Sequence, residues 1–485
     1  MLHHEDIKNL SELKSTFVDK HDELPFYLNF LRILKIGQLH SIFSSAKAKG
    51  VCGAKTFEFL FCFRFVSKSN VHQFMDNPMA DALGYGKDVY YRFKGNFKIN
   101  WRSFLFGVAT RSLDAVRQSG SDSCCEQSEI RALIFDDTTI EKTGYKIEGV
   151  SRVWNHVVGR SVLGYQLLVM GYFDGTFFIP LDFSFHREKG KNEKNRFGLK
   201  PKHYQKQRKK LIGKSSSGAQ RKKELDEKKT LMAVKMIKRA VAKGINAEYV
   251  LTDSWFTCWE LVKTALDNKL IYVGMFSKVK TKFDFRGKPM TYKVIRGVNR
   301  KKIKRNKRFN LYYIRVVVEW KSQPIVLYFT RKGKNGNWKV LLSTDLSSDF
   351  NQTVEAYQAR WSIEVFFKEC KQLLGLGKSQ STDFHVQVAD TTITMVQYIF
   401  LAVQHRMNNY ESMGRLFQNT KAEVLEMRLH QRLMALLIAI VQTLTEIFEQ
   451  CDSDQLMEKL IHDPEVFEKL KPILYPSSSS RGLAA

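Results

Sequence analysis

The sequence predicts an α/β protein with a β-rich insertion, flanked by helical N-terminal and C-terminal regions. Three β-type runs follow one another between residues 131 and 185, separated by turn residues, which is typical of an antiparallel meander. From residue 224 to 277 a helix, a strand, a helix and a strand alternate, as in open α/β sheets. In such sheets, sites gather at the carboxyl ends of strands.

The length and the flanking segments predict several domains. A chain of 485 residues exceeds what one hydrophobic core usually organises. The segments before and after the α/β segment show apolar residues at helical spacing. Within the α/β segment, further β-type runs occur before its last helix. We expect a helical N-terminal domain at 1–125, an α/β domain at 126–380 with the insertion at about 278–345, a helical C-terminal region at 381–475, and a disordered tail at 476–485.

The positive charge of the chain predicts a polyanionic partner. The formal net charge is +29 at pH 7, which is far more than solubility requires. Residues 187–223 hold fifteen Lys and Arg against two Glu, and residues 278–308 hold fourteen against one Asp. A single basic run is often only a solvated loop, but the overall charge makes nucleic acid the leading candidate for the partner.

Cysteine spacing and hydropathy exclude other classes of protein. The seven cysteines are scattered and form no Cys-x-x-Cys pair, so we expect reduced thiols and no zinc site. The segment MLHHEDIKNL lacks the features of a signal peptide, and the apolar stretch at 433–441 is too short to cross a bilayer. The sequence therefore predicts a cytoplasmic protein without a membrane segment.

Carboxylates mark the ends of two predicted strands. Asp136 and Asp137 close the run RALIFDD, and Asp253 closes YVLTD, each followed by polar or aromatic residues. A carboxylate at a strand end projects into a site, although an Asp in this position also commonly begins a turn or caps a helix.

A third carboxylate lies on a predicted helix within YQARWSIEVFFKECK. At 100° per residue, Tyr357, Arg360, Glu364, Lys368 and Lys371 share an arc of roughly 80°. The opposite face is apolar and would bury the helix against a core. The polar face alone is equally compatible with a solvated, ion-paired surface.

Three acidic residues brought together would suit phosphodiester chemistry. They would hold two Mg²⁺ ions, with Mn²⁺ as a substitute, about 3.5 to 4 Å apart, one activating the attacking oxygen and one stabilising the leaving oxygen. Neighbouring basic side chains would bind the DNA phosphates that carboxylates repel.

These motifs resemble those of DDE transposases of the insertion-sequence-four family, whose catalytic domain has an RNase H-like fold with a β-rich insertion. FDDTTIEKTG resembles the first-aspartate motif, VLTDSWF resembles the second, and the Tyr-x2-Arg-x3-Glu-x6-Lys signature is complete. The resemblance implies Asp137, Asp253 and Glu364 as catalytic metal ligands, with Tyr357, Arg360, Lys371 and Lys368 as DNA-binding residues. Asp136 remains the alternative to Asp137 on the residues alone.

The resemblance implies cut-and-paste transposition of a bacterial insertion sequence, with double-stranded DNA, as element ends and target, for its partner. The N-terminal domain would read the terminal inverted repeats, and a homodimer would pair two DNA ends close to the nucleoid, with the C-terminal region available for dimerisation. Some relatives use a Trp to hold a flipped base during hairpin formation. Trp338 and Trp255 are both candidates for this role, and core packing is the alternative for each.

Other enzyme classes lack support in the sequence. Two Gly-Lys-Ser tripeptides, at Gly213 and Gly377, lack the glycine five residues earlier that a phosphate-binding loop needs, so no ATP is expected. We expect His186, beside the first basic run, to be a phosphate contact or a surface residue. Two rival functions remain: an RNase H-like nuclease without strand transfer, and a non-catalytic DNA-binding protein.

Overall fold

The chain forms two units in a computed structural model. One comprises residues 34–61 and 69–414, and the other residues 1–33, 62–68 and 415–485. The structure describes residues 39, 41–44, 46, 50–66, 71, 86–118, 130–190, 192–408 and 412–421. In the second unit, residues 62–66 and 415–421 are helical, and the rings of Phe65 and Phe417 lie 5.4 Å apart. The apolar stretch at 433–441, the tail at 476–485 and Cys124, Cys125 and Cys451 lie outside the described residues.

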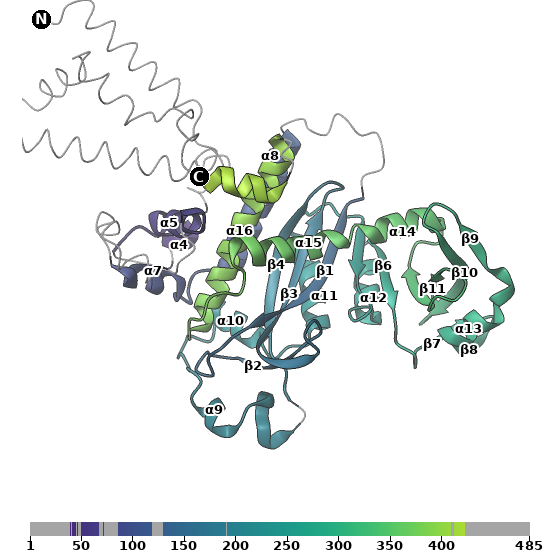
Figure 1. The fold of residues 1–485 in the computed structure, drawn as a ribbon, viewed down its shortest axis with the longest axis horizontal. Helices are drawn as coiled ribbons and strands as arrows, with labels where there is room; N and C mark the ends of the chain where they lie inside the picture. The colour runs from purple at the N-terminus through teal and green to yellow at the C-terminus, as the bar shows by residue number, and fades with distance from the viewer. Residues whose placement is uncertain are drawn as a thin grey trace, which may run out of the picture. The chain divides into compact units, whose positions relative to one another are not determined.

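A mixed sheet, 12-stranded within the described residues, organises the larger unit (Figure 1). The strand order is β2-β3-β1-β5-β6-β12-β11-β10-β7-β8, with β4 paired to β3 and β9 to β10. Only the β1–β5 and β5–β6 pairs are parallel. The strands are β1 (Ala132–Glu141), β2 (Ser151–Asn155), β3 (Arg160–Phe173), β4 (Phe178–His186), β5 (Tyr249–Thr252), β6 (Ile271–Phe276), β7 (Lys282–Phe285), β8 (Lys288–Thr291), β9 (Lys304–Asn306), β10 (Leu311–Trp320), β11 (Gln323–Lys332) and β12 (Lys339–Ser343).

Helices precede, connect and follow these strands. Before the sheet lie α4 (Ser41–Ser44), α5 (Gly53–Val66), α7 (Lys87–Lys94) and α8 (Trp101–Gln118). Between β4 and β9 lie the 3₁₀-helix η3 (Glu193–Gly198), α9 (Pro201–Gln205), α10 (Ser217–Glu224), α11 (Lys229–Ala242), α12 (Trp259–Asp267), α13 (Tyr292–Val298) and the 3₁₀-helix η4 (Arg300–Lys302). After β12 lie α14 (Phe350–Gln358), α15 (Trp361–Glu369), the π-helical turn η5 (Cys370–Leu374) and α16 (Phe384–Asn408).

The predicted antiparallel meander is present as β1, β3 and β4. Its strands are apolar on both faces because helices cover the sheet: α8, α10, α11 and α16 pack against β4, and α15 packs against β1 and β4. The short strand β2 was not predicted, because SRVWN has too few residues to show a period.

The β-rich insertion differs from the expected all-β unit in two ways. It contains the helix α13 and the 3₁₀ turn η4 among its strands. It also continues the central sheet, because β12 pairs with β6 in antiparallel register, Leu341 opposite Met275. The insertion thus extends the edge beside β5 and β6 (Figure 1).

Helix α16 is the longest apolar helix among the described residues. Phe384–Arg406 is long and apolar enough to cross a membrane, with a mean hydropathy of 1.3, yet 94% of this window is buried inside the protein. That burial is typical of a core helix, and α16 packs along α8 and β4. Sequence analysis selected 433–441 instead, because Thr and Gln residues interrupt the apolar run of α16.

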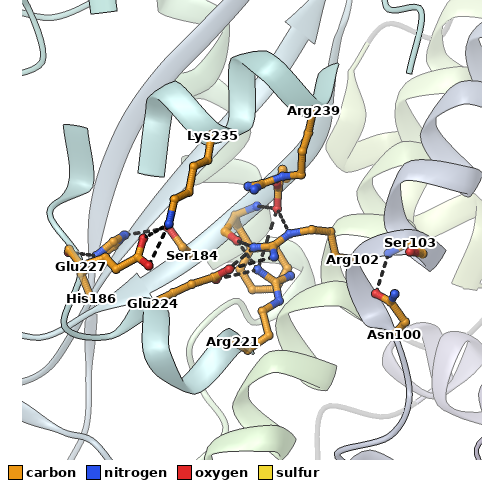
Figure 2. Close-up of polar contacts among 12 residues, drawn as sticks. Asn100, Arg102, Ser103, Ser184, His186, Arg221, Glu224, Glu227, Lys235 and Arg239 are labelled. Atoms are coloured by element: carbon orange, nitrogen blue, oxygen red, sulfur yellow. Dashed lines mark hydrogen bonds and ion pairs between the residues drawn. The ribbon is translucent and has the colours of Figure 1, made fainter. Parts of the chain in front are cut away.

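A buried ion cluster ties the N-terminal helix α8 to the sheet (Figure 2). The fully buried Asp182 on β4 accepts from Arg102 of α8, with Nε–Oδ1 2.8 Å, and from Arg239 of α11, with Nη2–Oδ2 2.6 Å. Arg102 also donates to both carboxylate oxygens of Glu224 at 2.8 and 2.9 Å. Removing one member would leave uncompensated buried charge, so the cluster fixes α8, α10 and α11 against β4.

Candidate active site

Asp136 and Asp137 lie in the middle of β1, not at its end as the sequence predicted. The strand continues to Glu141 because it pairs with β3 along its whole length, whereas its pairing with β5 stops at Ile134. Beyond Ile134, β1 therefore has an open edge on the β5 side, and both carboxylates are half-buried there. The backbone N–H of Asp137 donates to Oδ1 of Asp136 at 2.8 Å.

Asp253 follows β5 directly and is held in a tight turn. Its Oδ1 accepts from the backbone N–H groups of Trp255 and Phe256 at 3.0 and 3.1 Å. The register pairs Ile134 with Leu251, so Asp253 comes level with Asp136 on the neighbouring strand. The parallel arrangement of β1 and β5 thus brings the two aspartate motifs together, although more than a hundred residues separate them.

A network of buried hydroxyl groups holds the backbone of the Asp253 turn in place. Thr257 Oγ1 donates to the carbonyl oxygen of Asp253 at 3.0 Å. The fully buried Tyr272 hydroxyl lies 2.5 Å from Thr252 Oγ1 and 3.1 Å from Thr257 Oγ1. A side chain on Gly274 would come within 2.6 Å of Thr257 Oγ1, so this position requires glycine. The network fixes the backbone that carries Asp253.

Glu364 lies in the first turn of α15, which packs against β1. Arg360 joins it to the strand, because Nη2 contacts Glu364 Oε1 and Nη1 lies 3.4 Å from Asp136 Oδ2. The guanidinium also lies 5.8 Å from the ring centre of Tyr357. The structure therefore brings together Tyr357, Arg360 and Glu364 with both aspartate motifs.

The sequence predicted one continuous helix for these residues, but the structure divides it into two. Helix α14 ends at Gln358, and a turn at Ala359 and Arg360 precedes α15. A capping box, in which Asp349 and Gln352 exchange side-chain hydrogen bonds with each other's backbone, begins α14. The predicted apolar face is largely correct, since Ile363, Phe366, Cys370 and Leu374 are buried.

Lys368 and Lys371, the two lysines of the predicted polar helix face, differ in how close they lie to the carboxylates. Lys371 lies in the π-helical turn η5, and its Nζ donates to Thr138 Oγ1 at 2.6 Å, next to the β1 aspartates. π-helical turns within helices are frequent at functional sites. Lys368 is exposed in the last turn of α15. Lys371 therefore reaches the candidate site, whereas no described contact links Lys368 to it.

Lys229, the first residue of α11, was missed by sequence analysis. Its Nζ contacts Asp137 Oδ2 and lies 4.0 Å from the ring centre of Trp255. No local pattern marks this lysine, because 92 residues separate it from Asp137. Trp255 is 48% exposed beside it, whereas Trp338 is half-buried, with Arg331 and Arg296 at 4.6 and 5.7 Å from its ring centre.

The carboxylates raise one another's proton affinity. Burial and the charges of Asp253 and Asp137 raise the pKa of Asp136 to about 7, against opposing contributions from the Asp137 N–H and Arg360. Burial and Asp137 also raise the pKa of Asp253. Burial raises the pKa of Tyr357 to about 12. Negative charge is therefore crowded at this edge, and a cation placed among the carboxylates would relieve the repulsion.

The carboxylate oxygens are suitable ligands for a hard divalent cation, but in this structure two of the carboxylates form ion pairs with basic side chains of the protein. Carboxylate oxygens are the ligands that Mg²⁺ prefers. Among the described residues, no group of three or more His, Cys, Asp or Glu side chains is close enough to hold a metal ion together. Lys229 and Arg360 contact Asp137 and Glu364 instead. Metal binding would therefore require these two basic side chains to turn away from Asp137 and Glu364.

The two basic segments differ in how far their charges are exposed. In 187–223, several charges serve internal ion pairs, as for Lys210 with Asp383 and Lys222 with Glu148. In 278–308, which forms β7 to β9 with α13 and η4, most Lys and Arg side chains are exposed. The insertion therefore presents the more accessible positive surface.

Two comparisons with known families cover the candidate site. Residues 110–310 match the family model described as DDE superfamily endonuclease, and residues 220–408 match the one described as archaeal putative transposase ISC1217. The first range contains Asp137 and Asp253, and the second contains Asp253 and Glu364. No curated protein matches the chain. The matches support a DDE transposase, which is a nuclease-type enzyme acting on DNA, and the mixed sheet with its helices fits an RNase H-like DDE domain.

Proposed function

We propose that this chain is a DNA transposase of the insertion-sequence-four family. It binds the terminal inverted repeats of a bacterial insertion sequence, cleaves the DNA there and joins the freed end to target DNA. The observation that carries the proposal is the meeting of two aspartate motifs on the neighbouring parallel strands β1 and β5, with Glu364 on the helix packed against β1.

Asp137, Asp253 and Glu364 would hold two Mg²⁺ ions, or Mn²⁺ in their place. When bound, the ions would activate the attacking oxygen and stabilise the leaving oxygen. Arg360 and Lys371 would then turn from the chain's own oxygen atoms to DNA phosphates, since each is already within reach of the site. Tyr357 would contact the same backbone, and the exposed Lys368 would bind DNA further out.

The two chemical steps exchange phosphodiester bonds. In the first, water attacks the phosphorus, a bond between phosphorus and the water oxygen forms, and the bond to the 3′-oxygen breaks. The 3′-oxygen takes up a proton released by the water, which leaves a free 3′-hydroxyl and a 5′-phosphate. In the second, that hydroxyl attacks a target phosphodiester, so one phosphorus–oxygen bond forms as another breaks. Because bond number is conserved in this second step, no ATP is required.

The remaining assignments extend the same proposal. The N-terminal helical domain reads the element ends, and the helical C-terminal region supports a homodimer that pairs two ends. The protein acts in the bacterial cytoplasm at the nucleoid, where its DNA substrates lie. An RNase H-like nuclease without strand transfer would use the same carboxylates, and only joined products distinguish it. A non-catalytic DNA-binding protein has no need for all three carboxylates.

Cleavage of DNA carrying the element's own ends tests the proposal, with and without Mg²⁺, in the parent and in Glu364→Gln. We expect metal-dependent cutting that the substitution abolishes while DNA binding survives. The matched control is Glu319→Gln, the same change at an exposed position of β10. If Glu364→Gln cuts as well as the parent, Glu364 is not a metal ligand. If neither protein cuts but both bind, the non-catalytic function is favoured.

A further inference from the structure

A polar cavity lies beside the buried ion cluster, on the N-terminal side of α10. Its volume is about 180 Å³, and residues of α8, α10, α11, α16 and the segment before α8 form its walls. One water needs only about 10 to 15 Å³ measured in this way, so the cavity is large enough for a small polyatomic ligand. Arg102, Arg221 and Arg239 are among the residues that line it. Figure 2 shows these three side chains converging, with Asn100 and Ser103 on the other side of Arg102.

Residues that line this cavity carry buried nitrogen atoms without hydrogen-bond partners. Arg221 is 6% exposed, and its Nε and Nη2 atoms have no hydrogen-bond partner. Trp101 and His385 also line the cavity, and Trp101 Nε1 and His385 Nε2 are buried without partners. Arginine and tryptophan side chains can only donate, so the missing partner must supply acceptor oxygens. Buried groups of this kind in native proteins are normally satisfied by a ligand or water.

The charge of the surroundings favours an anion. Three guanidinium groups, of Arg102, Arg221 and Arg239, face two carboxylates, of Asp182 and Glu224, which leaves one positive charge uncompensated. Burial and the neighbouring Arg102 lower the pKa of Arg221 to about 10, which shows that the positive charge of Arg221 is disfavoured in this cluster. The face of the Arg221 guanidinium stacks on Phe183, with 4.3 Å to the ring centre, which leaves its N–H edge for hydrogen bonding.

We propose that this cavity binds a phosphate group, through the N–H edge of Arg221 together with Trp101 and His385. Phosphate offers several acceptor oxygens to a planar guanidinium fork and supplies the missing negative charge. The exposed side chains of Asn100, Ser103 and Gln220 form the rim through which it enters. Neither the carboxylate site nor its metal is involved, so the inference holds whether or not the chain transposes DNA.

Titration calorimetry of the full chain with inorganic phosphate, at constant ionic strength, tests the inference. We expect one site per chain in the parent. Gln220→Glu places a negative charge on the exposed rim and should weaken binding about tenfold, since like charge opposes the anion. The matched control is Gln205→Glu, the same change at an exposed position of α9 away from the cavity, which should leave the dissociation constant unchanged.

A second variant tests the buried donors directly. Arg221→Lys keeps the charge but removes the guanidinium edge, and its thermal unfolding is measured alongside to verify folding. We expect weaker phosphate binding in the folded variant. Competition by a short oligonucleotide with a 5′-phosphate, but not by its 5′-hydroxyl form, would identify a DNA strand end as the source of the phosphate. Competition by neither would identify free phosphate as the ligand. No binding by the parent, or equal binding by the parent and both variants, would overturn the inference and leave a water-filled cavity.

Discussion

The ammonium group of Lys229 contacts Oδ2 of Asp137, one of the three carboxylates that we propose as metal ligands. The two side chains come from the start of α11 and the middle of β1, and both are largely shielded, with 17% and 21% exposure. A lysine in this position competes with any cation that uses Asp137. Lys229 neutralises the charge of Asp137 in this structure, so a metal bound as proposed would have to displace the lysine from this carboxylate.

Replacing Lys229 with Gln should strengthen metal binding. Loss of a partly exposed ion pair is worth about 1 kcal/mol, so we expect about a fivefold lower dissociation constant for Mn²⁺. Titration followed by electron paramagnetic resonance measures free Mn²⁺ directly. Lys235→Gln, on the same helix and paired with Glu227, is the control and should not change the affinity. An unchanged affinity in Lys229→Gln would mean that the lysine does not compete with the metal.

The two adjacent aspartates of β1 should differ in their effect on catalysis. Asp136 is bound by Arg360 and by the Asp137 N–H, which suits a structural carboxylate, whereas Asp137 faces Lys229. We expect Asp137→Asn to lower the single-turnover rate of DNA cleavage at least about a hundredfold, since a metal ligand is lost. Asp136→Asn should lower it about tenfold or less. The reverse order would assign the metal to Asp136.

Some parts of the site could be predicted from sequence and others could not. The three carboxylates stand in short motifs, so local pattern was enough to select them as candidates. The apolar face of α15 is periodic, and local pattern was enough to predict its burial. The extension of β1 beyond Asp137 was missed because it depends on pairing with β3 and not on apolar residues. Lys229 was missed because its partner is distant in sequence, and the partners of Asp182 on α8 and α11 were missed for the same reason.

Tyr272 should contribute both to stability and to the position of Asp253. Tyr272 is fully buried, and Tyr272→Phe removes the hydroxyl that contacts Thr252 Oγ1 and Thr257 Oγ1 next to the Asp253 turn. Thr252 and Thr257 keep each other as partners at 3.3 Å, so only the hydrogen bonds of the lost hydroxyl count. Such a loss costs about 0.5 to 1.5 kcal/mol, and we expect a matching decrease in the free energy of unfolding by urea. Tyr312→Phe, on the half-buried start of β10, is the control. Cleavage should slow in Tyr272→Phe under conditions where the protein is fully folded, and an unchanged rate would separate the network from the site.

His186 should make the protein less stable in mild acid. The sequence predicted a phosphate contact or a surface residue, but His186 is buried at the end of β4. Both ring nitrogens have partners inside the protein: Nδ1 lies 3.0 Å from the carbonyl oxygen of Glu227, and Nε2 lies 2.7 Å from Ser184 Oγ (Figure 2). Burial lowers its pKa to about 4 from the usual 6.5, and Lys229 adds to this, against opposing contributions from the Glu227 backbone, Glu224 and Asp137.

The direction of the pH effect follows from this depressed pKa. Between pH 6.5 and 4 the unfolded chain binds a proton at His186 that the folded chain does not, so stability falls as the pH falls through this window. His186→Gln can retain both hydrogen bonds and does not titrate. Between pH 7 and pH 4.5, the free energy of unfolding of the parent should therefore fall by about 2 to 3 kcal/mol more than that of the variant. Urea unfolding at the two pH values in the presence of a chelator measures this difference and cancels the titration of the carboxylate site, which both proteins share. Equal losses in parent and variant would show that His186 is protonated in the folded protein as readily as in the unfolded chain.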